Sequence, residues 1–549
     1  CGREQKMAKL KQVLKQVFNR KDRPYSRHLI EKVRYILKFY KRMPRIKKAL
    51  SFSSGSSKVA MIDKYKPVRV LLPLIETSHY KCIQLLLIAK ALELRGATVK
   101  VVICGEALNA CEIRSVEKDN HPDPCWRCRF NQHNYLPLFN LDFITLKSLL
   151  NVEIGPMIIN TPDLGKIAEE ATTRHFYGAV PNSASLQRET YDRYLRTAEM
   201  SLRAAIASHM SFQPTLVLGY MMAYAEWAPW YNYYNSVSIR FRHIGSTQFS
   251  AHAQHFHWPQ LFENSNRFKK YIQTRSDSYL NDTERIQLQE YFNKRYRTDD
   301  VLKKLGLGKK LIGLDKIKYR LNIDTTKRNI FLFSSVLWDV GISDLGGLYS
   351  TVLEWVFDSI RIVAGEHDVH LYIRCHPAEQ VDSSFAITLE KQIHNEFPKL
   401  PDNVTIISSS NEISSYSLFS FIDLGVTFIG TIGLEMLQTG IPIVCTGKAP
   451  YAFLSSVAAP QTRDEYREML IDGTGLPTLN QEEIDLFQYF YFLRTPIPWS
   501  LTRHAYIADI LEPLPFHSLE TLLPGNDKHL DHLCACLIDD NLSPEAWPD

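Results

Sequence analysis

Apolar residues fall into short blocks after residue 67, and the order of these blocks predicts a fold. Residues 68–75 form an apolar run with the length of a buried strand, and the polar loop 76–80 follows. Apolar positions at helical spacing continue to Gly96, and a second strand pattern covers 98–104. Strand, helix and strand in so short a span make a βαβ unit, which implies a parallel sheet. The apolar run 214–219 is expected to be a later strand of this sheet.

A second block with the same alternation begins near Lys327. Helical periodicity covers 348–363. Further strands are expected at 329–334, 368–374, 404–407, 421–428 and 441–445. The chain is therefore predicted to be an α/β protein with two Rossmann-like domains facing a cleft, preceded by a basic helical arm.

Changes of pattern set the predicted boundaries within the 549 residues, a length that allows several domains. In chain order we expect an arm and linker over 1–57, a first Rossmann-like domain over 58–265, a charged helical connector over 266–325, a second Rossmann-like domain over 326–480, and a closing helix and tail over 481–549.

The first 50 residues have the pattern of two amphipathic helices, punctuated by Pro24 and Pro44. They hold 17 Lys or Arg and 3 Asp or Glu, which leaves a charge of −8 on the rest of this +6 chain. A basic amphipathic helix suits an anionic membrane surface. The alternative is an arm packed on its own protein or on a subunit. The Ser/Gly segment 51–57 predicts that the arm is a separate unit.

Composition excludes several classes of protein. Because the basic charge belongs to one end, the chain is unlike a nucleic-acid binder. It lacks both an apolar run long enough to span a membrane and the apolar core of a signal peptide. Ten cysteines are too few for a disulfide scaffold. We therefore expect a cytoplasmic location, peripheral on the inner face of the membrane if the arm binds there. Cys1 is interpreted as a fragment end rather than a lipid-bearing cysteine.

The segment Gly430-Thr431-Ile432-Gly433-Leu434-Glu435 follows a predicted strand and opens a predicted helix. Amides at such a turn suit a phosphate or diphosphate. Glu435, one turn into the helix, is placed to accept a hydrogen bond from a ribose hydroxyl. The alternative is an ordinary strand-to-helix turn, because glycines alone are a weak signal.

The segment 426–451 resembles the donor-binding segment of GT-B glycosyltransferases and is most similar to bacterial capsule and surface polysaccharide biosynthesis proteins. The run 373–379 resembles the His-Pro motif of that family, and 488–494 resembles its closing aromatic helix. The matching residues of the donor segment are Gly430, Thr431, Gly433, Glu435, Gly440, Pro442, Gly447, Ala449, Pro450 and Tyr451. The resemblance implies transfer of a sugar from a nucleotide-sugar donor, bound by the second domain, to a glycan or lipid-linked acceptor.

His376 and Pro377 come directly after a predicted strand, which is where ligands bind in α/β sheets. His376 is therefore a candidate donor to a phosphate oxygen. The alternative is a structural histidine that caps the loop. Arg374 adds a charge to the donor site, unless its alternation with Tyr372 points it into solvent.

A transferase that inverts the anomeric centre needs a base near the acceptor hydroxyl. Glu76 and His79 follow the first strand, so the loop places them at the carboxyl edge of the first sheet. We favour His79 as the base, with Glu76 orienting it or acting in its place, and a solvated polar loop is the alternative. Glu226 is a further candidate. The aromatic run around it, 224–234, suits sugar stacking or core packing.

Metal chemistry is expected away from the reaction. The sequence contains no Asp-x-Asp triplet, which favours a metal-independent GT-B enzyme, so catalysis requires no cofactor. Cys125 and Cys128 have the spacing of two metal-binding thiolates, and Cys111 is a candidate third ligand. The fourth would be His121 or His133. A structural zinc comes before an iron–sulfur cluster, and free or redox-active thiols are the alternative.

Two rival functions remain open from the sequence. A nucleotide-sugar epimerase shares the two-domain shape and needs no acceptor. A non-catalytic assembly protein would keep the fold without a base beside bound nucleotide.

Overall fold

The structure is a computed structural model. It describes residues 24–549 apart from 53–64, 66, 78–80, 112–122, 155–161, 179–182, 220, 245–248, 252–258, 298–312, 339–346, 381–386, 497–517, 540–541, 543–546 and 548–549.

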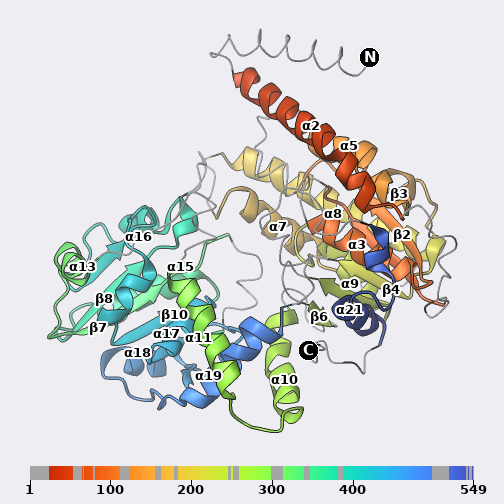
Figure 1. The fold of residues 1–549 in the computed structure, drawn as a ribbon. Helices are drawn as coiled ribbons and strands as arrows, with labels where there is room; N and C mark the ends of the chain where they lie inside the picture. The colour runs from red at the N-terminus through yellow and green to blue at the C-terminus, as the bar shows by residue number, and fades with distance from the viewer. Residues whose placement is uncertain are drawn as a thin grey trace.

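The first domain is built on a six-stranded sheet of order β3-β2-β1-β4-β5-β6, shown on the right of Figure 1. All neighbouring pairs are parallel except β5 and β6. The strands are β1 (Arg69–Leu74), β2 (Thr98–Ile103), β3 (Asp142–Thr145), β4 (Leu216–Gly219), β5 (Arg240–Ile244) and β6 (Phe249–Ala251). The apolar runs predicted as strands at 68–75, 98–104 and 214–219 are thus confirmed, and they are buried because helices cover both faces of a parallel sheet.

The helices of this domain lie on both faces of its sheet (Figure 1). They are α3 (Lys81–Glu93), α5 (Trp126–Asn134), α6 (Leu146–Leu149), α7 (Leu164–His175), α8 (Ala184–Phe212) and α9 (Ala228–Ser236), with the 3-10 turn η2 (Leu136–Phe139). The aromatic run in α9 is core: Trp230, Tyr233 and Tyr234 are at most 1% exposed. Of the two interpretations of that run, core packing is the one realised.

The arm is one helix over its described part, α2 (Pro24–Ala49), and Pro44 lies inside it. The predicted break at Pro44 is therefore wrong. Tyr35, Phe39 and Ile46 are buried in the core cluster of the first domain, so the expectation of a separate unit is also wrong for this helix. The first of the two predicted amphipathic helices, before Pro24, lies outside the described residues.

The second domain repeats the architecture with a six-stranded parallel sheet of order β12-β11-β10-β7-β8-β9. Its strands are β7 (Arg328–Phe333), β8 (Val369–Arg374), β9 (Val404–Ile407), β10 (Leu424–Thr427), β11 (Ile443–Cys445) and β12 (Val457–Ala458). Its helices are α15 (Val352–Val363), α16 (Leu389–Glu396), α17 (Ile432–Gln438), α18 (Arg463–Ile471) and α19 (Gln481–Tyr489), with the 3-10 turns η3 (Pro377–Glu379) and η4 (Ser415–Phe421) and the π-helical turn η5 (Phe490–Arg494). The strands predicted in this block are confirmed.

The charged segment between the sheets is helical, as predicted. It forms α10 (Pro259–Gln273), α11 (Asp282–Arg297) and α13 (Leu314–Leu321). Phe268, Phe292 and Ile317 of these helices are buried in one cluster with residues of α17 and α19. The segment therefore packs as part of the second domain rather than bridging solvent.

The chain ends by returning to the first domain. After η5 come the 3-10 turn η6 (Leu519–Leu522) and α21 (Lys528–Ile538), which packs against α3 (Figure 1). Arg95, 2% exposed, donates to the carbonyl of Leu522 at 2.8 Å and pairs with Asp531 at 2.5 Å. This buried arginine fastens the tail to the first domain.

The domains also meet next to the carboxyl edge of the second sheet. Tyr177, after α7, packs edge-on against Trp338, after β7, with ring centroids 5.2 Å apart. A cleft between the domains stays a prediction. Within the part of the chain that the structure describes, no helix is long and apolar enough to cross a membrane.

Candidate active site

Both sheets have the strand order 3-2-1-4-5-6 of the Rossmann fold, and this order fixes where ligands bind. The order reverses between β1 and β4 in the first sheet and between β7 and β10 in the second. At such a point the loops leave the strands in opposite directions and open a crevice at the carboxyl edge. Residues that follow these strands are therefore placed where a ligand would bind.

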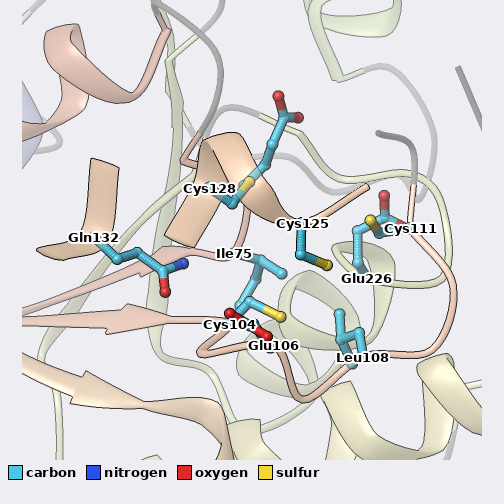
Figure 2. Close-up of a pocket in the computed structure, with 10 residues that line it drawn as sticks. Ile75, Cys104, Glu106, Leu108, Cys111, Cys125, Cys128, Gln132 and Glu226 are labelled. Atoms are coloured by element: carbon cyan, nitrogen blue, oxygen red, sulfur yellow. The ribbon is translucent and has the colours of Figure 1, made fainter. Parts of the chain in front are cut away.

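In the first domain a pocket lies at this crevice (Figure 2). Glu76 follows β1 and Glu226 follows β4, so the pocket lies between carboxylates from the two strands that flank the reversal. Its space, open solvent included, is about 440 Å³. The lining residues are Ile75, Glu76, Cys104, Glu106, Leu108, Cys111, Cys125, Cys128, Gln132 and Glu226. The structure thus brings together two carboxylates that are 150 positions apart in the sequence.

Two residues at or near this pocket have a left-handed backbone conformation. Tyr224 and Glu106 have φ of 69° and 64°, in the left-handed region that residues other than glycine adopt at a cost of about 1–2 kcal/mol. Tyr224 lies two residues before Glu226, which is 2% exposed, and Glu106 lines the pocket itself. Strain of this kind persists where the surroundings enforce it, and it gathers at functional sites.

The loop after β1 is fastened to α5. The Thr77 hydroxyl donates to the Cys128 carbonyl at 3.2 Å, and the Asn131 amide donates to the Thr77 carbonyl at 2.8 Å. Tyr35 of α2 donates to the Asn131 side chain at 2.8 Å. The arm therefore supports the segment next to Glu76. His79 lies outside the described residues, so its role as base stays a prediction.

The cysteines were expected to lie apart from the candidate base, and this is wrong: Cys111, Cys125 and Cys128 line the same pocket as Glu76. Cys104, which the sequence analysis missed, lines it too. Its position directly after β2, at the carboxyl edge, was the available signal. Burial raises the pKa of Cys104, and burial, with Glu76 nearby, raises that of Cys128 to about 12.

Among the described residues, no group of three His, Cys, Asp or Glu side chains is placed to hold a metal ion. His133 is exposed and does not line the pocket, and His121 lies outside the described residues. Cys111, Cys125, Cys128 and His133 are thus not gathered around one ion, and the structural zinc or iron–sulfur centre stays a prediction.

In the second domain His376 follows β8, the strand beside β7. Its Nδ1 accepts the backbone N–H of Ala378 at 3.1 Å, as the cap of η3, which Pro377 begins. Because Nδ1 is an acceptor, the ring proton lies on Nε2. Burial, with Arg374 nearby, lowers the pKa of His376 to about 4, so the ring is neutral near pH 7. A neutral imidazole with Nε2–H can donate to a phosphate oxygen.

Arg374 does not point into solvent. It is 1% exposed and donates to the carbonyls of Ser408 at 2.6 Å and Ile413 at 3.1 Å. The loop after β9 is thus tied to the end of β8. The observed contacts are structural, and binding of a donor by Arg374 stays a prediction.

The glycine segment follows β10, the strand across the reversal from β7. Gly430 and Thr431 are half-buried and lie at the start of α17. A Cβ on Gly433 would meet the Tyr451 hydroxyl at 2.3 Å, and that hydroxyl donates to the Gly430 carbonyl. The glycine at 433 is therefore required by the packing of Tyr451, which holds the turn in shape.

Glu435 is 2% exposed, and its carboxylate accepts from Arg295 Nε at 2.6 Å. The hydroxyl of Tyr296 donates to its carbonyl at 3.1 Å. These contacts fasten α11 to α17. Arg295 could not be predicted as a partner of Glu435, because it lies 140 positions away in the charged helical segment. A ribose contact by Glu435 stays a prediction, and the pair with Arg295 would have to open for it.

No protein-family model and no curated protein sequence matches the chain. Solved structures that resemble it include two described as Thermosulfurimonas dismutans KpsC. The beta Kdo 2,7 transferase is 14% identical over 50% of this chain and 74% of that one, with TM-score 0.30. The beta Kdo 2,4 transferase is 11% identical over 55% and 88%, with TM-score 0.34.

A UDP-GlcNAc 2-epimerase from Neisseria meningitidis, bound to UDP-GlcNAc, is 11% identical over 77% of this chain and 98% of that one, with TM-score 0.29. Because all these TM-scores are low, the fold class is assigned from the strand orders of the two sheets. Two Rossmann-ordered sheets with an N-terminal helical arm confirm the predicted two-domain α/β fold of GT-B type.

Proposed function

We propose that this chain is a glycosyltransferase that moves a sugar from a nucleotide-sugar donor to a glycan or lipid-linked acceptor, in surface polysaccharide biosynthesis. One observation carries the proposal. Each sheet has polar groups suited to one half of the reaction at the place where its strand order reverses. In the first domain, carboxylates lie at the reversal between β1 and β4. In the second domain, the His-Pro segment follows β8 and the glycine segment follows β10, and these are the two strands beside β7.

The second domain would bind the donor. His376 Nε2–H is available to donate to a phosphate oxygen, and Thr431 and the glycine turn lie at the end of the strand next to β7. Donors held in place by the fold stabilise the charge that develops on a leaving phosphate. Tyr451 keeps the turn in shape through its bond to Gly430. Arg374 and Glu435 would stabilise the donor site through their buried contacts.

The first domain would bind the acceptor and supply the base. Glu76 and Glu226 line one pocket, and either carboxylate can take the proton of an acceptor hydroxyl. His79 is three residues beyond Glu76 in the same loop and is the third candidate. Catalysis is proposed to be metal-independent because the sequence has no Asp-x-Asp triplet. Residues 1–23 are proposed to reach an anionic membrane, since the apolar face of α2 is used in packing.

The test is an assay of purified protein with a panel of nucleotide-sugars, with and without bacterial glycan and lipid-linked acceptors. We expect nucleotide release that depends on acceptor, together with a product of higher mass. Change of the free nucleotide-sugar into its epimer without acceptor would overturn the proposal in favour of an epimerase. Lack of nucleotide binding by calorimetry across the panel would indicate a non-catalytic protein.

The base is assigned by comparing His79→Ala, Glu76→Gln and Glu226→Gln at saturating donor and acceptor. The variant that lacks the base should lose about a hundredfold or more in turnover while keeping donor affinity. Glu106→Gln is the matched control, because Glu106 lines the same pocket and pairs with Arg129 at 2.8 Å. Near-parental turnover in all three variants would place the base elsewhere.

A further inference from the structure

Helix α2 carries a second apolar row, on the side opposite the one that is buried. The buried row is Tyr35, Phe39, Ile46 and Ala49. The second row repeats at spacings of three and four residues, so its side chains lie along one face of the helix. Its members are Leu29, Val33, Leu37 and Tyr40. Two residues separate Val33 from Tyr35, and such a step turns an α-helix by about 200°, which places the two rows on opposite sides.

The second apolar row lies at the surface of the first domain. Leu29 is 45% exposed and Tyr40 is 53% exposed, while Val33 and Leu37 are half-buried. In Figure 1, α2 runs along the outside of this domain. Single apolar residues are common on protein surfaces, but several together on one face mark a surface that binds a partner.

A row of basic residues runs beside the apolar row, displaced from it by one residue. It has the same spacing of three and four, and its members are Arg34, Lys38, Lys41, Arg45 and Lys48. In all, α2 holds nine Lys or Arg and one acidic residue, Glu31, which pairs with Arg127 of α5. The partner of this face should therefore be both apolar and negatively charged.

We infer that this face of α2 docks the folded first domain on an anionic lipid bilayer. Helices that lie in the membrane interface place apolar side chains between headgroups and acyl chains, and their Lys and Arg remain at the anionic headgroups. A soluble polyanion would contact the basic row alone and leave the apolar row in water. The inference goes beyond the proposed membrane contact of residues 1–23, because α2 is packed into the domain.

Docking through α2 would also orient the pocket of the first domain. Phe39 of α2 packs edge-on against Phe130 of α5, with ring centroids 5.0 Å apart. Cys128 and Gln132 of the same helix α5 line the pocket. The bilayer, α2, α5 and the pocket would thus follow one another, with packed helix axes about 8–10 Å apart. Delivery of a lipid-linked acceptor to this pocket rests on the proposed function, whereas the docking itself does not.

The test is flotation of the full chain with vesicles of phosphatidylcholine alone or mixed with phosphatidylglycerol. We expect binding to the mixed vesicles at low salt, and weaker binding as salt screens the charges. A triple variant with Lys41→Gln, Arg45→Gln and Lys48→Gln removes three exposed charges of the basic row. Its partition coefficient on the mixed vesicles should be about a hundredfold lower than that of the parent.

The matched control removes three exposed charges from α6 and α8 of the same domain, through Lys147→Gln, Arg196→Gln and Arg203→Gln. It should bind as the parent does. A double variant with Leu29→Ala and Tyr40→Ala tests the apolar row and should lower the partition coefficient about tenfold or more. Because all the substituted side chains are exposed, each variant should keep the parental melting temperature.

Parental binding by the triple variant of α2 would overturn the inference, because the contact would then belong to residues 1–23. Loss of binding in that variant with parental binding in the double variant would also overturn it, and would assign the basic row to a soluble polyanion. So would a lack of binding of the parent to the mixed vesicles at low salt. Sugar transfer to a soluble acceptor is assayed without vesicles, so its failure leaves this result standing.

Discussion

The hydrogen bond from Ala378 determines which ring nitrogen of His376 carries the proton. Since Nδ1 accepts from Ala378, the histidine both caps η3 and presents Nε2–H. The same side chain thus satisfies the structural and the functional interpretation, and a substitution has to separate them.

We expect His376→Ala and His376→Asn each to lower turnover at least tenfold, because both remove the Nε2–H donor. Asparagine is a good cap, so His376→Asn should keep the parental melting temperature. Turnover and thermal unfolding are measured on the same preparations. Parental turnover in His376→Asn would leave the histidine as a cap only.

Glu379 ends the His-Pro motif and is 2% exposed. Burial raises its pKa to about 7 from the usual 4.5, although its Oε2 accepts the Leu389 N–H at 3.1 Å. The folded protein therefore keeps a proton that the unfolded chain loses above about pH 4.5. The stability that the neutral form gives is complete below that pH and is lost as the pH rises through about 7.

Glu379→Gln keeps a neutral side chain of the same shape at every pH. The variant should therefore gain stability relative to the parent between about pH 5 and about pH 8, by up to about 3 kcal/mol. Urea unfolding at several pH values measures this. Equal pH slopes for the two proteins would mean that Glu379 titrates normally.

At the scale of residues, motifs that are local in the sequence could be predicted. The meeting of distant residues in one site could not. The position of His376 follows from the strand before it, and Gly430 from the turn. By contrast, the meeting of Glu76 with Glu226 depends on β1 and β4 being neighbours, which a single sequence does not state. Cys104 was missed although it ends a predicted strand, because it is not part of a Cys-x-x-Cys pair.

At the scale of elements, α11 is held to α17 by the pair of Arg295 and Glu435, with Glu435 fully buried in it. Removing one partner leaves a buried group without its counter-charge. Arg295→Ala, which leaves the buried Glu435, should lower the free energy of unfolding by about 3 kcal/mol. Glu435→Ala should cost less, because the Arg295 side chain that it leaves is 34% exposed.

The exposed pair of Arg320 and Glu412, at 2.6 Å, is the control, and Arg320→Ala should cost less than about 1 kcal/mol. Nucleotide affinity is measured on the same variants. If Glu435→Ala loses nucleotide binding with the stability of the parent, the glutamate acts on the donor rather than on α11.

The arm shows how tertiary packing overrides a local signal. Proline inside a helix costs about 3 kcal/mol, yet α2 continues past Pro44 because Ile46 and Ala49 are buried beyond it. The basic residues correctly marked a helix with one polar face. They did not show that its apolar face lies on α5.

Phe39 should matter more than its neighbour Tyr40. Phe39 is fully buried against Phe130, with ring centroids 5.0 Å apart, so Phe39→Ala should cost about 3–4 kcal/mol. Tyr40 is 53% exposed, and Tyr40→Ala should stay within about 0.5 kcal/mol. Chemical unfolding measures both, and equal losses would mean that α2 is not packed in solution as described.

At the scale of the whole molecule, the strands that are apolar runs were predictable. The strands β3, β5, β6 and β12 were not predicted, because they are short or carry polar residues. The return of the tail was not predictable either: Arg95 meets Leu522 and Asp531 across more than 400 positions. Trp547 likewise donates to the Arg494 carbonyl at 3.1 Å, which links the end of the chain to the turn that closes the second domain. The tail thus joins two domains whose reversal points are proposed to hold the donor and the acceptor.

The most direct test of this arrangement is a crystal structure of the full chain with the nucleotide that binds best in calorimetry. We expect the nucleotide at the carboxyl edge of the second sheet, between β7 and β10, with a phosphate oxygen about 2.7–3.2 Å from His376 Nε2. A nucleotide bound in the first-domain pocket, or with phosphates out of reach of both His376 and Thr431, would contradict it.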